Sequence, residues 1–446
     1  MLERIRLFLT LPFIRNTLKL SSSSVLLMLL PLVVTPILSR LYTPVDYSDW
    51  GVFSSVVQIV NSFLFLSYEN TIVRENDTKN IPSLIFLCLI VSSTIIAIVY
   101  LLFSLGRQIG IGFFVSFPSL GLLIAMLFTN GVYTLLNNVS NREKKYGPMA
   151  IANVINGSSQ ALIRIALGLW PIISFGLIVG NVLAHLIGVT FLILSLHTIL
   201  RAYSFKTVTI SDIKLQAIKN KKFAVFDAPA RFMEFAIGHL ALIVLSLFWA
   251  KNEIGCYSMI VQFVLLPITI VGSAMGNVYY REISESIDNK EKIETSTRRV
   301  AKITFSLSLA PILFLVLGGD ILLEKFLGSQ WIGSGRMALC MVAYSVPVIM
   351  SEPLLPIYRA LDKQEIRFRF NVLNFVLSIG LLITTSFLIE SIYLVVLIYS
   401  ISYAIVRFMI FKSELKLVGL DYKSVSRYFF FIIIGVYALL FARLII

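Results

Sequence analysis

Long apolar runs follow one another through almost the whole chain, and each is long enough to cross a lipid bilayer as a helix. A spanning helix needs about 20 apolar residues. Composition agrees, because 57% of the residues are hydrophobic and 14% are charged, whereas a water-soluble domain carries about 25% charged residues. The sequence therefore predicts an all-α integral membrane protein. Twelve runs have this length: 21–41, 51–73, 82–105, 112–137, 149–170, 172–200, 224–250, 255–278, 300–323, 332–358, 368–390 and 391–411.

Basic residues are distributed unevenly between the connections, although the net charge of +14 could by itself suggest a nucleic-acid partner. Thirty of the 38 Lys and Arg residues fall in or next to every second connection, and six fall in the others. This asymmetry is the positive-inside pattern of membrane proteins. It predicts a multi-pass protein with a cytoplasmic N-terminus, whose first 20 residues form an interfacial segment, and no nucleic-acid partner.

The spans divide into two sets of six that echo each other. Gly51–Gln58 opens the second helix, and Gly255–Gln262 opens the eighth; they share Gly, Ser, Val and Gln in register. Because six spans separate them, the two copies run in the same direction, as in transporters built from parallel repeats. The expected plan is an interfacial segment 1–20, an N-lobe 21–200, a basic linker 201–223, a C-lobe 224–411 and an extra C-terminal helix 428–446.

The seventh span carries three charges on one face. Asp227, Arg231 and Glu234 stand at positions i, i+4 and i+7, which coincide on an α-helix. An arginine at mid-membrane costs roughly 2.5–3.5 kcal/mol on insertion scales, so this face must contact protein or water. Three interpretations remain open: a salt-bridged packing face, anion binding by Arg231, or protonation of Asp227 or Glu234 during transport.

The fifth span has a second polar face, formed by Asn153, Gln160 and Arg164. Arg164 has no acidic neighbour on its own helix within a turn. It therefore needs either an anionic ligand, which we favour, or a structural partner such as Glu69.

Polar residues also line one face of the second and eighth spans, where Gln58 and Gln262 occupy matching positions. Such side chains suit sugar hydroxyls, but they also hold helices together. Glu69 ends the second span, and Glu352 lies beside two prolines in the tenth, as a candidate for ion coupling. Taken together, the residues predict a transporter with a hydrophilic, cationic cavity between two lobes, suited to an anionic, hydroxyl-rich solute.

Several stretches resemble the polysaccharide transporters, of the O-antigen and capsule flippase type, in the multidrug/oligosaccharidyl-lipid/polysaccharide (MOP) exporter superfamily. The resemblance covers about residues 20–410, and no single motif in it is diagnostic. A thirteenth helix departs from the twelve-helix plan and leaves the side of the C-terminus open. The resemblance is carried by Pro36–Tyr47 with Gly51, Tyr68–Val73, Asn141–Lys144, Phe223–Tyr257, Asn277–Ser284 and the region of Trp331.

The resemblance implies two bundles of six helices around a cavity that opens alternately to each side. It also implies a polyprenyl-pyrophosphate-linked oligosaccharide as cargo, cationic residues in the cavity, and coupling to an H⁺ or Na⁺ gradient. No cofactor, metal or catalytic residue is expected. The expected partners are the lipid bilayer, the lipid-linked oligosaccharide and other polysaccharide-assembly membrane proteins, for a monomer in the bacterial inner membrane.

The first hypothesis is accordingly a flippase of O-antigen, lipopolysaccharide, capsule or exopolysaccharide biosynthesis. The alternatives are a membrane polysaccharide polymerase or ligase, and a multidrug exporter of the same superfamily. The candidate ion-coupling residues are Glu69, Asp227, Glu234 and Glu352. The candidate substrate-binding residues are Arg164, Arg231, Gln160, Asn153, Gln58 and Gln262.

Overall fold

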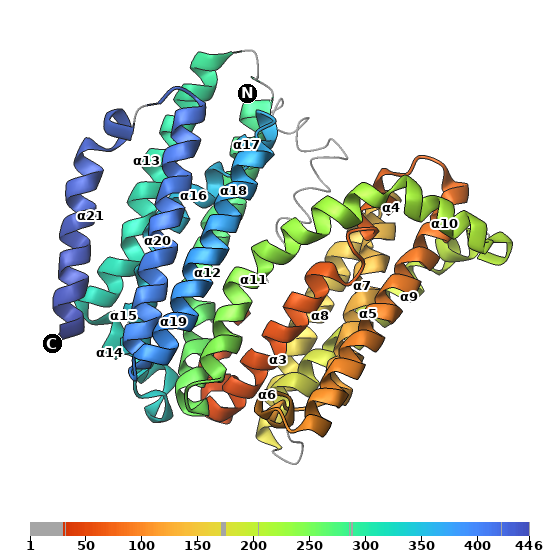
Figure 1. The fold of residues 1–446 in the computed structure, drawn as a ribbon, viewed down its shortest axis with the longest axis horizontal. Coiled ribbons are helices and arrows are strands. Elements are labelled where there is room, and N and C mark those ends of the chain that lie inside the picture. Colours follow the sequence, from red (N-terminus) through yellow and green to blue (C-terminus); the bar gives the residue numbers. More distant parts are fainter. Residues whose placement is uncertain are drawn as a thin grey trace, which may run out of the picture. The chain divides into compact units, whose positions relative to one another are not determined.

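The computed structural model describes residues 30–445 apart from 32, 171–174, 204, 285, 287, 288 and 421. The described chain is helical nearly throughout and contains no strand (Figure 1). The all-α prediction is therefore confirmed. The expected interfacial segment 1–20 and the first part of the first span lie outside the described residues.

The chain divides into two compact units. The N-terminal unit comprises Met1–Tyr42 and Val52–Phe235, and the C-terminal unit comprises Thr43–Gly51 and Ala236–Ile446. In chain order, the helices of the first part are α3 (Pro44–Phe63), α4 (Glu69–Arg74), α5 (Ile81–Ile109), α6 (Gly112–Ser116), α7 (Leu120–Arg142), α8 (Tyr146–Leu169), α9 (Gly176–Ala202), α10 (Ile210–Lys219) and α11 (Ala228–Ser246). Those of the second part are α12 (Lys251–Ser284), α13 (Lys290–Phe314), α14 (Asp320–Leu327), α15 (Ser334–Val342), α16 (Ser345–Ser351), α17 (Ile357–Ala360), α18 (Gln364–Asn374), α19 (Gly380–Leu388), α20 (Ile392–Leu417) and α21 (Tyr422–Ile445).

Eight described helices are long and apolar enough to cross a membrane, or nine if the bent pair Ser334–Val342 and Ser345–Ala360 forms one span. The twelve predicted runs differ from this number for physical reasons. α3 and α8 are long enough to span a membrane. Their polar side chains, however, make their mean hydropathy lower than that of the other spanning helices. A helix of this kind is stable in a membrane only if its polar face contacts protein or water. These two helices are therefore where a site is expected.

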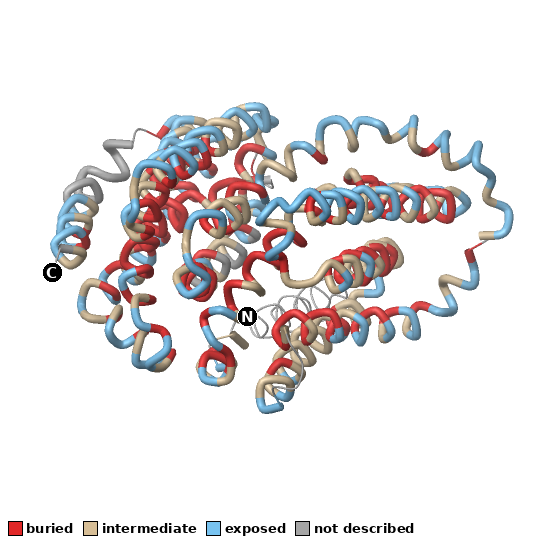
Figure 2. The backbone as a smooth tube through the Cα atoms, turned by 60° about the horizontal axis from the view of Figure 1, so that its bottom comes forward, coloured by how far each residue is buried: buried red, intermediate tan, exposed pale blue. Residues whose placement is uncertain are grey.

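The N-terminal unit is built around α9, which packs along α7 and α8. Its core contains Tyr133, Ala152, Leu192 and Leu196, all buried. Side chains on the opposite faces are apolar and exposed, as Leu101 on α5 illustrates. Buried and exposed residues consequently form stripes along single helices (Figure 2), as expected when lipid solvates the outside.

The C-terminal unit is centred on α12, α16 and α20, with α13 and α15 packed against them. Trp331, Tyr358 and Phe411 are completely buried in this unit. The start of α3 belongs here because two glycines allow close contact with α12. A Cβ on Gly255 would lie 1.8 Å from the Pro44 carbonyl oxygen, and one on Gly51 would lie 2.3 Å from Ser258 Oγ. The two glycines that match in the sequence repeat thus serve one helix contact.

The predicted lobe boundary in the linker 201–223 requires a correction. The units instead divide at Phe235/Ala236, inside α11, and the segment Thr43–Gly51 belongs to the C-terminal unit. The linker residues belong to the N-terminal unit because α10 packs against α5 and is hydrogen-bonded to the end of α4 through Lys219 and Glu75.

Candidate functional site

The second predicted span is broken rather than continuous. α3 ends at Phe63, and α4 begins at Glu69. Between them Leu66 and Ser67 have positive φ angles of 49° and 61°, a conformation that costs a non-glycine residue on the order of 1–3 kcal/mol. Strained backbone of this kind persists only where the surrounding structure holds it, and it clusters at functional sites.

The seventh span is irregular at its beginning. Residues Phe223–Asp227 form a π-helical turn that leads into α11. Pro229 follows two residues later, and a proline cannot donate the backbone hydrogen bond that a regular helix needs. The wider turn accommodates this missing donor. It also presents Asp227 and Arg231 at the same end of α11.

The two irregular segments meet in the N-terminal unit, where they form what we call the Arg231 cluster: Glu69, Asn70, Asp227 and Arg231. Arg231 forms an ion pair with Glu69 and donates a hydrogen bond to it. Asn70 Nδ2 donates a long hydrogen bond of 3.5 Å to Asp227 Oδ2. The glutamate side chain is 5% exposed, whereas the arginine side chain is 35% exposed. In this ion pair, the carboxylate is therefore buried and the guanidinium is accessible.

Several polar atoms at this break have no hydrogen-bond partner among the described residues. They are the second carboxylate oxygen of Glu69, the Ser67 hydroxyl and both amide atoms of Asn61. Buried polar atoms are nearly always paired in proteins, so each exception needs an explanation. Within the described chain, the nine residues 61–69, which run from the end of α3 across the break to the start of α4, contain three such side chains, and this indicates space for bound water or a polar ligand.

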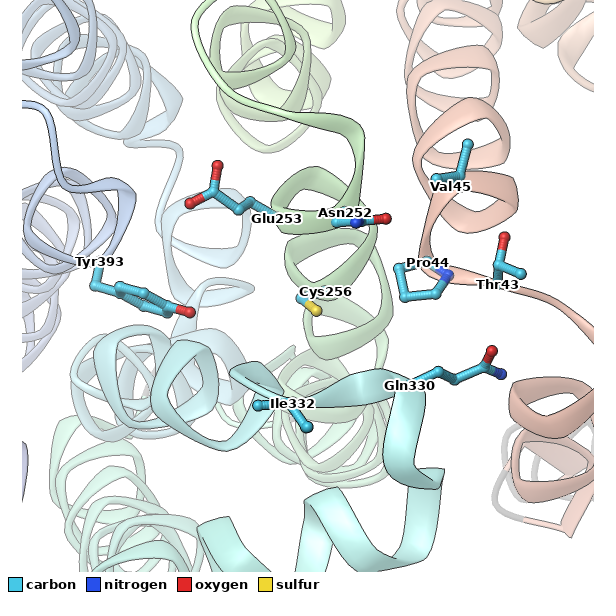
Figure 3. A pocket seen from close by; sticks show the side chains of 9 residues that line it. All are labelled: Thr43, Pro44, Val45, Asn252, Glu253, Cys256, Gln330, Ile332 and Tyr393. Carbon is cyan, nitrogen blue, oxygen red and sulfur yellow. The ribbon is translucent and has the colours of Figure 1, made fainter.

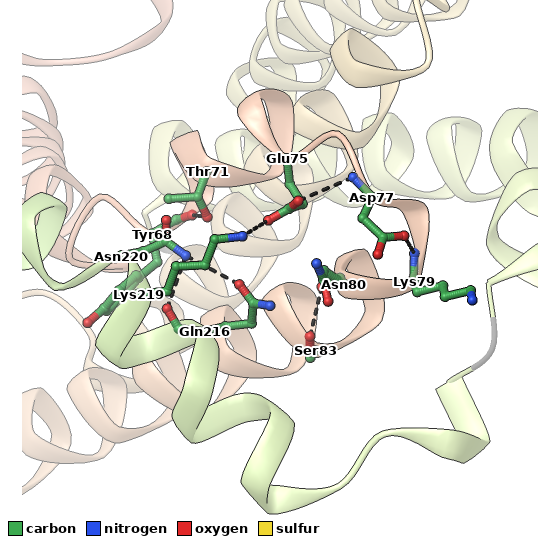
Figure 4. A network of polar contacts seen from close by, with 10 residues as sticks. All are labelled: Tyr68, Thr71, Glu75, Asp77, Lys79, Asn80, Ser83, Gln216, Lys219 and Asn220. Carbon is green, nitrogen blue, oxygen red and sulfur yellow. Dashed lines mark hydrogen bonds and ion pairs between the residues drawn. The ribbon is translucent and has the colours of Figure 1, made fainter.

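A network of polar contacts secures the cluster on its α10 side (Figure 4). Lys219 Nζ lies 2.6 Å from Glu75 Oε2, and the Tyr68 hydroxyl donates to the Ala217 carbonyl at 3.3 Å. The Arg74 guanidinium lies 5.5 Å from the centre of the Phe223 ring. The hydrogen bond from Lys219 lowers the pKa of Glu75. These contacts hold α4 and the π-helical turn in place beside α10.

The polar face of α8 contacts neighbouring helices. Tyr133 donates a 2.6 Å hydrogen bond to Asn153, and Gln160 donates one to Asn181 of α9. Arg164 is 8% exposed, and its Nε donates to the Leu177 carbonyl at 3.1 Å. The alternative in which Glu69 pairs with Arg164 is wrong, because Glu69 pairs with Arg231. The contacts of α8 are those of a helix-packing face, while its predicted ligand-binding role stays a prediction.

The remaining predicted residues are separated. Gln58 is exposed on α3 in the N-terminal unit, and Glu234 is exposed on α11. Gln262 belongs to the C-terminal unit, where its Nε2 donates to the Ser258 carbonyl at 3.4 Å. Among the predicted residues, the structure thus brings Glu69, Asp227 and Arg231 together.

The C-terminal unit contains a second buried ion pair, between Glu352 and Arg407 of α20. Its exposure is reversed, since the arginine side chain is 8% exposed and the glutamate side chain is 38% exposed. Seven residues further along α20, Glu414 is completely buried. Neither of its carboxylate oxygens has a hydrogen-bond partner in the part of the chain that the structure describes.

Arg407 and Glu414 are missing from the candidates that the sequence suggests. The predicted twelfth span ends at residue 411, which leaves Glu414 in the basic connection that follows, and Arg407 in the last turn of the span counts among the basic residues of that connection. α20 in fact continues to Leu417, so Arg407 and Glu414 both lie on this helix. An acidic residue placed three residues after an apolar span was the available signal.

Comparison with known proteins identifies the family. Residues 37–336 match a family of polysaccharide biosynthesis proteins, which is about two thirds of the chain. The chain belongs to this family. No curated protein matches the sequence.

Solved structures share the fold at low sequence identity. An inward-facing multidrug resistance MATE family transporter of the MOP superfamily is 15% identical with a TM-score of 0.69, over 88% of this chain and 94% of that one. The lipid II flippase MurJ, in an inward closed conformation, is 13% identical with a TM-score of 0.70, over 95% and 97% of the two chains. A MOP superfamily transporter from Pyrococcus furiosus is 16% identical with a TM-score of 0.53, over 91% and 96%. This protein therefore has the fold of MOP transporters. The resemblance to that superfamily seen in the sequence is confirmed.

Proposed function

We propose that this polysaccharide biosynthesis protein flips a polyprenyl-pyrophosphate-linked oligosaccharide across the bacterial inner membrane. The observation that carries the proposal is the accessible arginine of the Arg231 cluster. A guanidinium presents five N–H donors in a planar fork that matches phosphate oxygens. Glu69 accepts a hydrogen bond from one N–H group of Arg231 and thereby fixes the orientation of the guanidinium. The N–H groups of the guanidinium that do not bind Glu69 are then available to a phosphorylated head group.

The broken helix supports the same assignment. In transporters, discontinuous helices place backbone and side-chain polar groups at the substrate site. The break at residues 64–68 adjoins the cluster, and Asn61, Ser67 and Glu69 offer polar atoms there. Sugar hydroxyls both donate and accept hydrogen bonds, so amide and hydroxyl groups of this kind suit the glycan part of the cargo.

Ion coupling is assigned in this proposal to the carboxylates of the C-terminal unit. Glu352 is accessible, and Glu414 is buried beyond it. A buried carboxylate without a donor requires a counter-charge, and a proton or Na⁺ supplies one. Arg407, bonded to Glu352, connects the two groups. Binding of the ion at Glu414 would then change how firmly Arg407 holds Glu352.

Multidrug export is the second candidate function. It is favoured by the similarity of fold to a MATE family transporter and by the accessible carboxylate of Glu352, which suits a cationic solute. The two functions differ in the residue that would bind the charged group of the substrate. An anionic cargo requires Arg231, whereas a cationic drug requires Glu352.

The experiment replaces Arg231 by Ala and by Lys in cells that lack the chromosomal copy, with Arg201→Ala, an exposed residue near the end of α9, as a matched control. Loss of a charge-assisted contact predicts at least about tenfold less exported polysaccharide for R231A. Lipid-linked precursor should accumulate on the cytoplasmic side, and R231K should recover part of the activity. Normal polysaccharide from R231A, together with drug sensitivity in the E352Q strain, would instead establish the multidrug function.

A further inference from the structure

A pocket of about 440 Å³ opens at one end of the C-terminal unit. This volume lies within the range of about 300–1,000 Å³ that is usual for small-molecule sites. Its walls come from the start of α3, the start of α12, the α14–α15 connection and the start of α20 (Figure 3). Its lining includes Asn252, Glu253, Gln330, Ile332 and Tyr393.

All four wall segments belong to the connections that contain few basic residues. The charge distribution predicts that these connections lie outside the cytoplasm. Since they lie at one end of one compact unit, the pocket opens on the extracytoplasmic side in that topology. It is separate in the sequence from every residue of the Arg231 cluster.

The pocket wall between α14 and α15 is rigidly built. Trp331 is completely buried, and its ring packs edge-on against Tyr47 at a centroid distance of 5.2 Å. Glu324 Oε1 accepts hydrogen bonds from the backbone N–H groups of Gly333 at 2.8 Å and Gly335 at 3.0 Å. Gly333 has a φ of +92°, which few other residues adopt. This connection therefore holds its shape without a ligand, so Gln330 and Ile332 are fixed at the pocket edge.

The polar groups of the pocket include one carboxylate that has no partner. Glu253 makes no side-chain hydrogen bond or ion pair with any described residue, although Lys251 is two residues away. Lys251 instead pairs with Asp49 at 2.7 Å. Glu253 and Asn252 line the pocket from the start of α12, where their side chains point to opposite sides of the helix, and the Tyr393 hydroxyl points toward Cys256 from another wall (Figure 3). The Arg336 guanidinium stacks on the Tyr393 ring at 5.1 Å and fixes that phenol.

We infer that this pocket is a binding site for a neutral or amino sugar on the extracytoplasmic side. A carboxylate, an amide and a phenol provide the acceptors and donors that vicinal hydroxyls need, and Ile332 provides an apolar edge for a sugar ring. The free carboxylate selects against acidic sugars, because like charges repel. The inference rests on the proposed function insofar as the sugar belongs to the transported glycan, which would engage this site after crossing.

The test is saturation-transfer NMR on the purified full-length protein with glucose, glucosamine and glucuronic acid as probes. Transfer to glucose and glucosamine is expected, with much weaker transfer to glucuronic acid. Glu253→Gln should weaken the binding of glucosamine about tenfold, as loss of a hydrogen bond to a charged group predicts. Glu390→Gln is the matched control, because Glu390 is exposed next to α20 but does not line the pocket; it should bind as the parent does.

Three results would overturn the inference: no transfer from any sugar, equal transfer from glucuronic acid, or unchanged binding in E253Q. Thr43→Cys adds an independent measurement, since a membrane-impermeant maleimide should label it in intact cells, more slowly when glucose is present. Labelling that is unaffected by glucose would count against an occupied pocket. Failure here leaves the flippase test at Arg231 intact, and a negative result at Arg231 with sugar binding retained would reject only the flippase assignment.

Discussion

In the N-terminal unit Arg231 pairs with Glu69, and in the C-terminal unit Arg407 pairs with Glu352. The residue types are the same, but the exposed member differs. The arginine is accessible in the first pair, with 35% of its side chain exposed, and the glutamate is accessible in the second, with 38% exposed. A buried pair of this kind adds little net stability. What it determines is which charge the surroundings encounter.

Under the proposed function, this reversal assigns two tasks to two different sites. An accessible guanidinium attracts anions, whereas an accessible carboxylate attracts cations. In each unit the buried member of the pair fixes the orientation of the accessible one. If the proposed function holds, the first pair presents donors to an anion and the second presents acceptors to a cation.

The largest expected effect comes from removing the accessible member of either pair. R231A leaves Glu69 buried without its partner, and E352A does the same to Arg407. Stranding a buried charge costs about 3–5 kcal/mol, so both variants should unfold at clearly lower temperature in a thermal-denaturation assay of the purified protein. The double variant Glu69→Gln with Arg231→Gln should recover most of that stability and still export no polysaccharide.

The same double variant tests whether the Glu69–Arg231 pair is needed for transport. Recovery of both stability and export would mean that the first pair is purely structural and that the cation is not needed for transport.

A second large effect is expected at Glu414. E414Q removes the ionisable group but keeps the shape, so folding should be retained while transport loses its dependence on the ion gradient. The measurement is precursor flipping in reconstituted vesicles, with a pH gradient and a Na⁺ gradient imposed separately. The gradient that drives the parent but not E414Q identifies the ion, and equal responses of parent and variant would exclude this residue from coupling.

A smaller effect is expected at Arg164, which donates a hydrogen bond to the backbone of α9. R164Q should cost about 1–3 kcal/mol, the penalty for leaving a buried backbone acceptor unpaired, as measured by thermal unfolding. Its export per folded molecule should stay close to that of the parent. Export that is lost to the same degree as in R231A would show that both arginines hold the cargo.

The hydrogen bond from Tyr133 to Asn153 is expected to contribute still less. Tyr133→Phe should lower stability by about 1 kcal/mol without a change in export, since the bond joins α7 to α8 away from the Arg231 cluster. A strong export defect in Y133F with normal stability would place the α8 face at the substrate.

The smallest effect is expected at the exposed pair Lys219–Glu75. K219A should reduce stability by at most about 1 kcal/mol, and less in high salt. Because the folded protein lowers the pKa of Glu75, this contribution is present above the ordinary carboxyl pKa. It is lost as the pH falls through the lowered value. Parent and K219A should therefore converge in acid, which thermal unfolding at several pH values would detect.

The membrane-spanning, all-helical fold follows from the sequence because apolar length alone decides whether a helix is stable in lipid. Local pattern also identified Glu69, Asp227 and Arg231 as unusual, since a charge within an apolar run is visible without any structure. The matching Gly51 and Gly255 likewise indicated a repeat. The sequence did not indicate that both glycines lie in one contact between α3 and α12.

Pairing and exposure could not be predicted in this way. Which carboxylate meets Arg231 depends on the strained turn at Leu66 and Ser67 and on the π-helical turn before α11, and neither irregularity has a periodic signature. Glu414 was not predicted as a site residue, because α20 extends beyond the apolar run from which the end of the span was predicted. The sequence alone thus determined where charge enters the membrane; only the tertiary structure decided which charge is buried, because burial depends on helices that are distant in the chain.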